Sequence, residues 1–501
     1  MNSLVIVPIL VTGLLAAARL VAPGGRDGAF RPRVHLGPVL VGVLALAAIL
    51  PGQASAARSI STGIADSAFM DSQTSLRNQW LDNAEGENVS LLRIGVNWSF
   101  VAGTPKPDNP TDPADPGYNW TAIDRIVREA SDRGFEVMFL MNTAPRWAEG
   151  PNRPSGEQAG SWKPDPAEFG RFGLALATRY SGSYPDPQGG VLPRVRYYES
   201  FNEPNLDFWI SPQYSGGKNT GPELYRKLSN AFAESVKAVH VDNKIVGPAL
   251  APFGGITGER RTRTRPLKFM RDLFCLKGRK KLKPKRCPGG EKYIVDIVSH
   301  HPITVTGPPT QKAFHPDDAT SGDMGKVKRI VQAAKRGNTI VTSGRVPLWA
   351  SEYWYRTNPP VADGVSLKKQ ARWVEQSLYV WWRKGVSMAI YNAMRDRPSF
   401  DPAAAFGLYF RDGEAKPSAR AFAFPFVADR RSGRKVVLWG KSPATGKLKV
   451  QRQRGKRWKT IARFNATDGK VFTKKVKIRS KAKLRASVAG QRSLTWGLGK
   501  R

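Results

Sequence analysis

The sequence has few residues of the kinds that build metal or redox centres. Its 501 residues include two cysteines, Cys275 and Cys287, and five histidines. No His or further Cys lies close to the two cysteines, so we expect no metal there. In an exported chain, such a closely spaced pair favours one disulfide over a redox site. The intervening segment, LKGRKKLKPKR, has seven basic residues in eleven, and a covalent tie would hold it against its own repulsion.

Acidic residues are almost missing from the C-terminal part of the chain. Residues 431–501 contain 23 Lys or Arg and one acidic residue, Asp468, and so contribute +22 of the net charge of +39. Such a surface attracts polyanions through its long-range field and through counterion release. We expect an anionic cell-wall phosphate polymer, acidic polysaccharide or lipid surface as the partner. Nucleic acid is not expected, because the protein would have to meet it outside the cell. The alternative is a solvated basic face without a specific partner.

The first 57 residues have the character of a targeting segment. They contain two apolar runs, and the second, Leu36 to Leu50, follows two arginines and leads to the small residues Ala54-Ser55-Ala56. This order is typical of a secretory signal, so we expect export and a mature chain that begins near Ala57. An uncleaved anchor or membrane hairpin is the alternative, because the first run approaches the length of a spanning helix.

The central part of the chain alternates short β-branched or aromatic runs with helical patterns. This alternation predicts repeated βα units, and eight of them would close a (β/α)8 TIM barrel over residues 58–428. The expected strands are Thr62 to Asp66, Leu91 to Trp98, Glu136 to Asn142, Arg194 to Asn202, Lys244 to Leu250, Tyr293 to His301, Val346 to Tyr353 and Ser387 to Asn392.

After Pro425 the pattern changes to short alternating segments separated by Gly, Ser and Asp. This pattern predicts a small all-β, sandwich-like accessory domain over residues 429–501. Its expected strands include Lys435 to Trp439, Leu448 to Gln453 and Trp458 to Phe464. The predicted chain is therefore a targeting segment, a barrel and a basic β domain.

Two glutamates stand where catalytic residues of a barrel are expected. In a TIM barrel the active site lies at the C-terminal ends of the strands. Asn202-Glu203-Pro204 ends the fourth predicted strand, and Glu352 ends the seventh. Cleavage of a glycosidic bond needs a proton donor and a second carboxylate, and carboxyls about 5 to 5.5 Å apart lead to retention of configuration.

This pairing resembles clan A, the four/seven superfamily of glycoside hydrolases, with the cellulase-like and β-xylosidase-like families nearest. The resemblance implies that Glu203 is the acid/base, Glu352 the nucleophile and Asn202 the amide that binds the sugar 2-OH. It also implies that Arg93 lies near the nucleophile. Family members usually carry a Tyr at the top of strand six where this chain has Ile303. We expect Tyr353 or Tyr355 to take over its hydrogen bond.

Further residues at predicted strand ends are candidates for substrate contact. His301 is favoured over His300 because neighbouring residues of a strand point to opposite faces. Asn142 ends the third strand. Aromatic side chains could stack on sugar rings or, as the alternative, pack under loops; these are Trp98, Trp147, Trp209, Tyr353 and Trp354.

The favoured hypothesis is a secreted retaining glycoside hydrolase that acts on a β-linked oligo- or polysaccharide. Two carboxylates suffice for this chemistry, so neither metal nor cofactor is expected. Two alternatives stay open. One is a cell-wall-binding protein with weakened catalysis, suggested by Ile303 and the basic tail. The other makes the basic C-terminal domain the main functional element, an adhesion module that carries the barrel.

Overall fold

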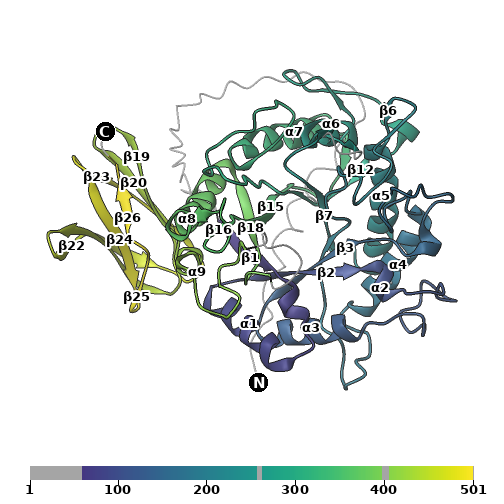
Figure 1. Cartoon of the computed structure of the whole chain (residues 1–501), viewed down its shortest axis with the longest axis horizontal. Helices are drawn as coiled ribbons and strands as arrows, with labels where there is room; N and C mark the ends of the chain where they lie inside the picture. Colours follow the sequence, from purple (N-terminus) through teal and green to yellow (C-terminus); the bar gives the residue numbers. More distant parts are fainter. Residues whose placement is uncertain (1–58, 257–261, 398–404, 500–501) are drawn as a thin grey trace, which may run out of the picture. The chain divides into compact units, whose positions relative to one another are not determined.

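The computed structural model describes residues 59–256, 262–397 and 405–499. Eight parallel strands form a closed barrel in the order β1-β18-β15-β13-β7-β4-β3-β2, and helices surround it (Figure 1). The predicted TIM barrel is therefore confirmed. The expected signal segment lies outside the described residues. The barrel strands are β1 (Ser61–Ala65), β2 (Leu91–Asn97), β3 (Glu136–Asn142), β4 (Tyr197–Glu199), β7 (Lys244–Leu250), β13 (Ile297–His300), β15 (Leu348–Tyr353) and β18 (Val386–Asn392).

Two barrel strands, the fourth and the sixth, differ from their predicted bounds by more than two residues. The fourth is only three residues long, because the chain bends after β4 and reaches a left-handed backbone conformation at Glu203. The predicted sixth strand is divided in two. Its first part, β12 (Tyr293–Ile294), pairs outside the barrel with β14 (Ile340–Val341), and only β13 joins the barrel. Between them the buried carboxylate of Asp296 accepts a hydrogen bond from Ile245 N and pairs with Lys237.

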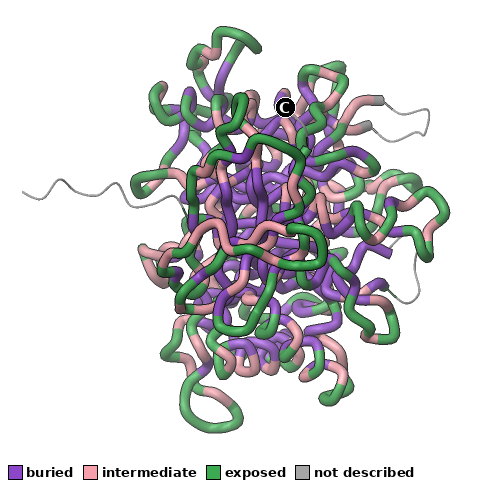
Figure 2. The backbone as a smooth tube through the Cα atoms, turned by 90° about the vertical axis from the view of Figure 1, so that its left-hand side faces the viewer, coloured by how far each residue is buried: buried purple, intermediate pink, exposed green. Residues whose placement is uncertain are grey.

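The helices bury an apolar stripe against the strands and expose their polar side. In α3, the buried residues Ile123, Ile126, Val127 and Ala130 recur at helical spacing. Figure 2 shows buried backbone in the middle of the molecule and exposed turns at its outside. None of the helices in the described ranges is long and apolar enough to span a bilayer. The helices are α1 (Thr74–Gly86), α2 (Trp98–Val101), α3 (Thr121–Asp132), α4 (Pro166–Arg179), α5 (Gly221–Val239), α6 (Pro266–Leu273), α7 (Met324–Arg336), α8 (Leu367–Lys384) and α9 (Pro417–Ala423).

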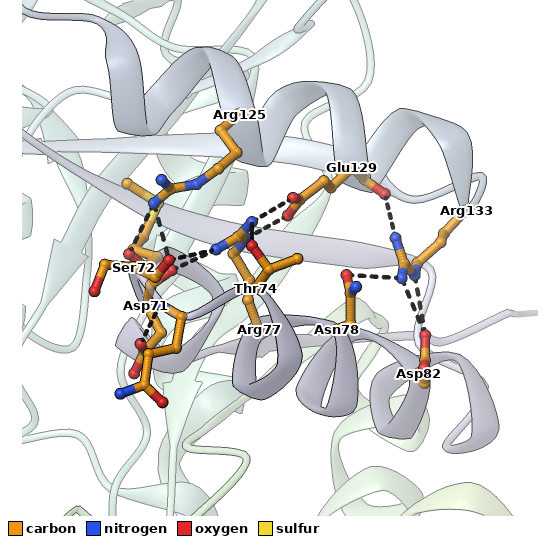
Figure 3. A network of polar contacts seen from close by, with 11 residues as sticks. Asp71, Ser72, Thr74, Arg77, Asn78, Asp82, Arg125, Glu129 and Arg133 are labelled. Carbon is orange, nitrogen blue, oxygen red and sulfur yellow. Dashed lines mark hydrogen bonds and ion pairs between the residues drawn. The ribbon is translucent and has the colours of Figure 1, made fainter.

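Polar contacts join neighbouring helices of the outer layer. Between α1 and α3, the guanidinium of Arg77 donates to both carboxylate oxygens of Glu129, at 2.6 and 2.7 Å (Figure 3). Arg133, just after α3, donates to Asp82 of α1 at 3.1 Å. The Arg77 side chain is buried, so its bidentate geometry fixes the spacing of the two helices more firmly than an exposed pair would.

The C-terminal region consists of antiparallel strands, as predicted. One sheet has the order β19-β20-β23, and a second has the order β22-β21-β24-β25, with β26 also on β24. The first strand begins at Phe426, three residues before the expected domain boundary. The strands are β19 (Phe426–Ser432), β20 (Lys435–Lys441), β21 (Gly446–Arg454), β22 (Arg457–Ala466), β23 (Val471–Lys477), β24 (Ala482–Val488), β25 (Gln491–Arg492) and β26 (Trp496–Leu498).

The expected disulfide is present. Cys275 and Cys287 are joined with their Cα atoms 5.1 Å apart. They close a small hairpin of β10 (Leu276–Lys277) and β11 (Lys283–Pro284). Lys285 of this segment pairs with Asp272 at the end of α6, at 2.9 Å. The disulfide and this ion pair hold the basic segment against the barrel's outer helices.

A buried lysine links the C-terminal sheets to the barrel. Lys441, at the end of β20, is 4% exposed, and its ammonium donates to Thr62 Oγ1 at 3.0 Å and Asn88 O at 3.1 Å. Burial lowers the pKa of Lys441 to about 8. Thr62 also donates to Asn88 O at 3.0 Å, so these two groups keep a partner without the lysine.

We expect Lys441 to make stability depend on pH. Between pH 8 and 10.5 the native state has lost this proton while the unfolded chain keeps it, so stability rises with pH across this window. Relative to Lys441→Met, the wild type should gain up to about 3 kcal/mol in the free energy of unfolding between pH 7 and 10.5. Urea unfolding at each pH measures this difference. Lys435→Met, on the same strand but exposed, is the control. Parallel pH dependence of wild type and Lys441→Met would contradict the assignment.

Candidate active site

The barrel brings three predicted site residues, Glu352, Asn202 and His301, together around the guanidinium of Arg93. Arg93 lies on β2 and is 4% exposed. It donates to Glu352 Oε2 and to Asn202 Oδ1, both at 3.0 Å, and its Nη2 lies 3.3 Å from His301 Nε2. It also donates to Glu199 on β4 at 2.7 Å. Burial by itself lowers the pKa of Arg93, but the charges of Glu199 and Glu352 outweigh this effect and raise it. Arg93 is therefore a fixed positive charge.

His301 connects the two predicted catalytic glutamates. Its Nδ1 lies 2.9 Å from Glu203 Oε1 and 3.8 Å from Glu352 Oε2. Its Nε2 faces Arg93, which can only donate, so Nε2 is the acceptor nitrogen and Nδ1 carries the proton. His301 therefore donates a hydrogen bond to Glu203 and leaves the second carboxyl oxygen of Glu203 available.

The backbone around Glu203 is held in an uncommon conformation. Glu203 has φ 39°, a region that residues other than glycine rarely adopt. Side chains farther along the loop hold it there. Gln213 Nε2 donates to Pro204 O at 2.8 Å, and the amide of Asn205 bonds to Ala251 N and Thr264 O. This loop aims the Glu203 carboxyl at the barrel mouth, where the side chain is 17% exposed.

Glu352 is held as a carboxylate by donors on both oxygens. Asn392 Nδ2, at the end of β18, donates to Oε1 at 3.0 Å, and Arg93 donates to Oε2. Arg397 donates to Asn392 Oδ1 at 3.2 Å, which fixes the orientation of that amide. Burial raises the pKa of Glu352, but His301, Arg93 and the Asn392 hydrogen bond outweigh it and hold the pKa below its usual value.

The two glutamates lie within reach of the same small volume. Because one histidine nitrogen is close to an oxygen of each, these two oxygens are less than about 7 Å apart. Retaining enzymes have their carboxyls about 5 to 5.5 Å apart, and inverting enzymes about 6.5 to 9.5 Å. The side chain of Glu352 is 15% exposed, similar to that of Glu203. A ligand at the barrel mouth can therefore reach both.

Two aromatic residues predicted to bind substrate belong to the core instead. Trp98 begins α2, is fully buried, and packs against Trp147, Phe169 and Phe172. Tyr353 is 1% exposed. It follows Glu352 on β15, so it points to the opposite face of the strand, where it meets Trp381 of α8.

Neither tyrosine expected to replace the missing Tyr of strand six does so. Tyr353 is packed in this outer layer, and the Tyr355 hydroxyl bonds to Ser377 of α8 at 2.8 Å. Ile303 itself is 5% exposed. The contacts that orient Glu352 are those of Arg93 and Asn392.

The other predicted contact residues lie at the end of the barrel that is formed by the C-terminal ends of its strands and the segments that follow them. Asn142, the last residue of β3, pairs in register with Asn97 of β2 and is half-buried. Trp147, Trp209 and Trp354 are also half-buried. The Trp147 indole donates to Gly103 O at 3.0 Å, and Trp354 stacks on Phe406 at 5.0 Å. His300 is buried and bonds to Ala319 O, away from the glutamates.

Sequence reasoning missed Glu199, Asn392 and Arg397 as parts of the site. Glu199 precedes the Asn-Glu-Pro motif by three residues, and its burial depends on the charge of Arg93 from another strand. Asn392 ends the eighth predicted strand, so a polar side chain at that place was the available signal. Among the described residues, no group of three or more His, Cys, Asp or Glu side chains is placed to hold a metal ion.

Neither a protein-family model nor a curated protein matches the sequence. Solved structures, by contrast, do match the chain. The chain is similar to a family 39 glycoside hydrolase from the gut symbiont Bacteroides cellulosilyticus WH2, with 15% identity, a TM-score of 0.52, and 84% of this chain and 81% of that chain covered. It is also similar to a glucosidase from Croceicoccus marinus (15% identity, TM-score 0.49, 84% and 97% covered). At this identity the first likeness shows the fold, and the chemistry rests on the site.

We expect the Asn392 amide to lower the pKa of Glu352 measurably. In Asn392→Ala the hydrogen bond to Oε1 is lost while Arg93 still holds Oε2, so the Glu352 pKa should rise. Titration of ¹³C-carboxyl-labelled glutamate by NMR measures it, with Glu352→Gln to assign the signal. Asn142→Ala, at the end of another barrel strand, is the control. An unchanged Glu352 pKa in Asn392→Ala would show that the amide does not act on this carboxylate.

Proposed function

We propose that the protein is a secreted retaining glycoside hydrolase that acts on a β-linked oligo- or polysaccharide. The observation that carries the proposal is the pair Glu203 and Glu352, joined through His301 yet placed in different environments. Glu352 has donors on both oxygens, which suits a nucleophile that stays ionised. Glu203 has one oxygen bonded to His301 and the other available for a transferable proton.

In the first step, Glu203 donates its proton to the glycosidic oxygen while Glu352 attacks the anomeric carbon. The bond to the leaving sugar breaks, and a covalent glycosyl ester with Glu352 forms with inverted configuration. In the second step, Glu203, now a carboxylate, takes a proton from water, which displaces Glu352 and restores the configuration. Neither step needs a cofactor.

Arg93 and Asn202 support these steps. Arg93 stabilises the Glu352 carboxylate as it leaves the ester, because its charge is fixed and already oriented. The Asn202 side-chain oxygen accepts from Arg93 at 3.0 Å, so its NH2 group faces away from the guanidinium. That group is the one we assign to the sugar 2-OH.

The alternative of a barrel with weakened catalysis is less well supported. It was suggested by the basic tail and by Ile303, which stands in place of a tyrosine that would orient the nucleophile. Because Arg93 and Asn392 bind both oxygens of Glu352, the carboxylate is oriented without that tyrosine. The half-buried Trp147, Trp209 and Trp354 are our candidates for sugar stacking.

The two glutamates should respond differently to substitution. In Glu203→Ala, hydrolysis of an aryl glycoside with a poor leaving group should fall by about 10² to 10⁴-fold, since acid catalysis is lost. An activated dinitrophenyl glycoside should form the ester nearly normally. In Glu352→Gly, turnover should stop, and azide should restore it by attacking from the vacated side to give an α-glycosyl azide.

A panel of aryl β-glycosides, with products resolved by chromatography, measures both effects. Glu291→Gln, at an exposed glutamate outside the site, is the control and should retain full turnover. A β-glycosyl azide from Glu352→Gly, or equal loss on both leaving groups in Glu203→Ala, would contradict the assigned roles.

A further inference from the structure

We propose that the outer face of the larger C-terminal sheet binds an acidic polysaccharide. This basic face consists of side chains of β21, β22 and β24: Lys447, Lys449, Trp458, Arg463, Lys483 and Arg485. The proposal does not rest on the function of the barrel, because every residue of the face belongs to the C-terminal strands.

The alternation of β21 separates the two faces of the sheet. Leu448 and Val450 are fully buried, whereas Lys447 and Lys449 are exposed. Residues directly opposite each other on neighbouring strands share a face. Lys449 pairs with Arg463 of β22, so that exposed arginine joins the lysines on the outer side.

The same register places an aromatic ring and amide groups among these charges. Trp458 of β22 lies opposite Gln453, and Arg485 of β24 lies opposite Gln451. The Arg485 guanidinium lies over the Trp458 ring, 4.1 Å from its centre, and donates to Gln451 Oε1 at 2.9 Å. Trp458 is half-buried, so part of the ring remains accessible.

The basic face keeps its charge without neutralising partners. Lys449 and Arg463 are directly opposed, an arrangement that destabilises a strand pair. In the described part of the C-terminal sheets, none of the cations of this face forms an ion pair with a carboxylate. In the barrel, by contrast, Arg77, Arg93 and Arg179 each contact one. A sheet that carries this repulsion is stabilised when an anionic ligand covers it.

The chemistry of the face favours a sugar polymer among polyanions. Cations recur about 5 Å apart across strands and about 7 Å apart along them, the scale of single sugar units in a chain. Gln451 and Gln453 supply amide groups for sugar hydroxyls, and Trp458 offers a ring for stacking. No large hydrophobic residue of 405–499 is fully exposed, which favours a sugar polymer over a membrane surface.

The test compares the full-length protein with two triple variants of equal charge loss. Lys447→Gln/Lys449→Gln/Arg463→Gln removes cations of the basic face, and Lys474→Gln/Lys475→Gln/Lys477→Gln removes exposed cations of β23 in the other sheet. Probes are polygalacturonate for carboxylate, phosphomannan for phosphate, and neutral mannan, with single-stranded DNA and anionic phosphatidylglycerol vesicles as the competing classes. Binding is measured by calorimetry over a series of salt concentrations.

We expect the first triple variant to bind polygalacturonate or phosphomannan at least tenfold more weakly, with a shallower salt dependence, and the second to bind nearly as the wild type. Whichever of these two polysaccharides binds the wild type more tightly identifies carboxylate or phosphate as the anionic group of the ligand. Trp458→Ala should weaken binding without changing the salt slope. Equal losses of affinity in both triple variants would overturn the proposal. Tighter binding of DNA or of vesicles than of polygalacturonate and phosphomannan would also overturn it. Turnover of a small neutral aryl glycoside should be unchanged in every variant, which separates this test from that of the barrel.

Discussion

The candidate active site depends on one buried positive charge. The Arg93 guanidinium contacts Glu199, Glu352, Asn202 and His301, which come from three other segments of the barrel, namely the end of β4, the end of β13 and β15. A buried charge is tolerated only when its partners satisfy it, and removal of one partner costs about 3 to 5 kcal/mol. Each contact therefore stabilises the others, and together they fix where the two candidate catalytic carboxyls stand.

That arrangement also places two residues of the same type in different environments. Glu352 faces Arg93 and Asn392, which favour its charged form. Glu203 accepts a hydrogen bond from His301, whose tautomer follows from its other nitrogen facing Arg93. In the proposed mechanism, the orientation of donors around Arg93 distinguishes the nucleophile from the acid/base, and no tyrosine at position 303 is needed.

Much of the fold was predictable because strands of a barrel are continuous apolar runs. The bounds of β3 and β7 agree with the predicted ones, since each is a buried run that begins at a charged residue, Glu136 or Lys244, and ends at Asn142 or just before Ala251-Pro252. The sixth strand was not predicted correctly, because its apolar run serves two separate sheets and only Asp296 marks the division. The pairing of Glu203 and Glu352 followed from their places at strand ends.

What the sequence did not reveal was the face on which a side chain lies and the partner it finds across the barrel. Tyr353 and Glu352 are neighbours in the chain, yet one belongs to the core and the other to the site. Trp98 is a strand-end aromatic by position but is enclosed by helix α4. Glu199 and Arg93 are 106 residues apart in sequence, and the pairing of both β2 and β4 with β3 brings them together.

The central claim is that Glu203 and Glu352 act in a double displacement. Proton NMR of the sugar released from an aryl β-glycoside tests it most directly, because the configuration of the first product is seen before the anomers interconvert. The account predicts that the β-anomer appears first and that the α-anomer grows in later. If the α-anomer appears first, the mechanism is inverting, and Glu352 is not the nucleophile.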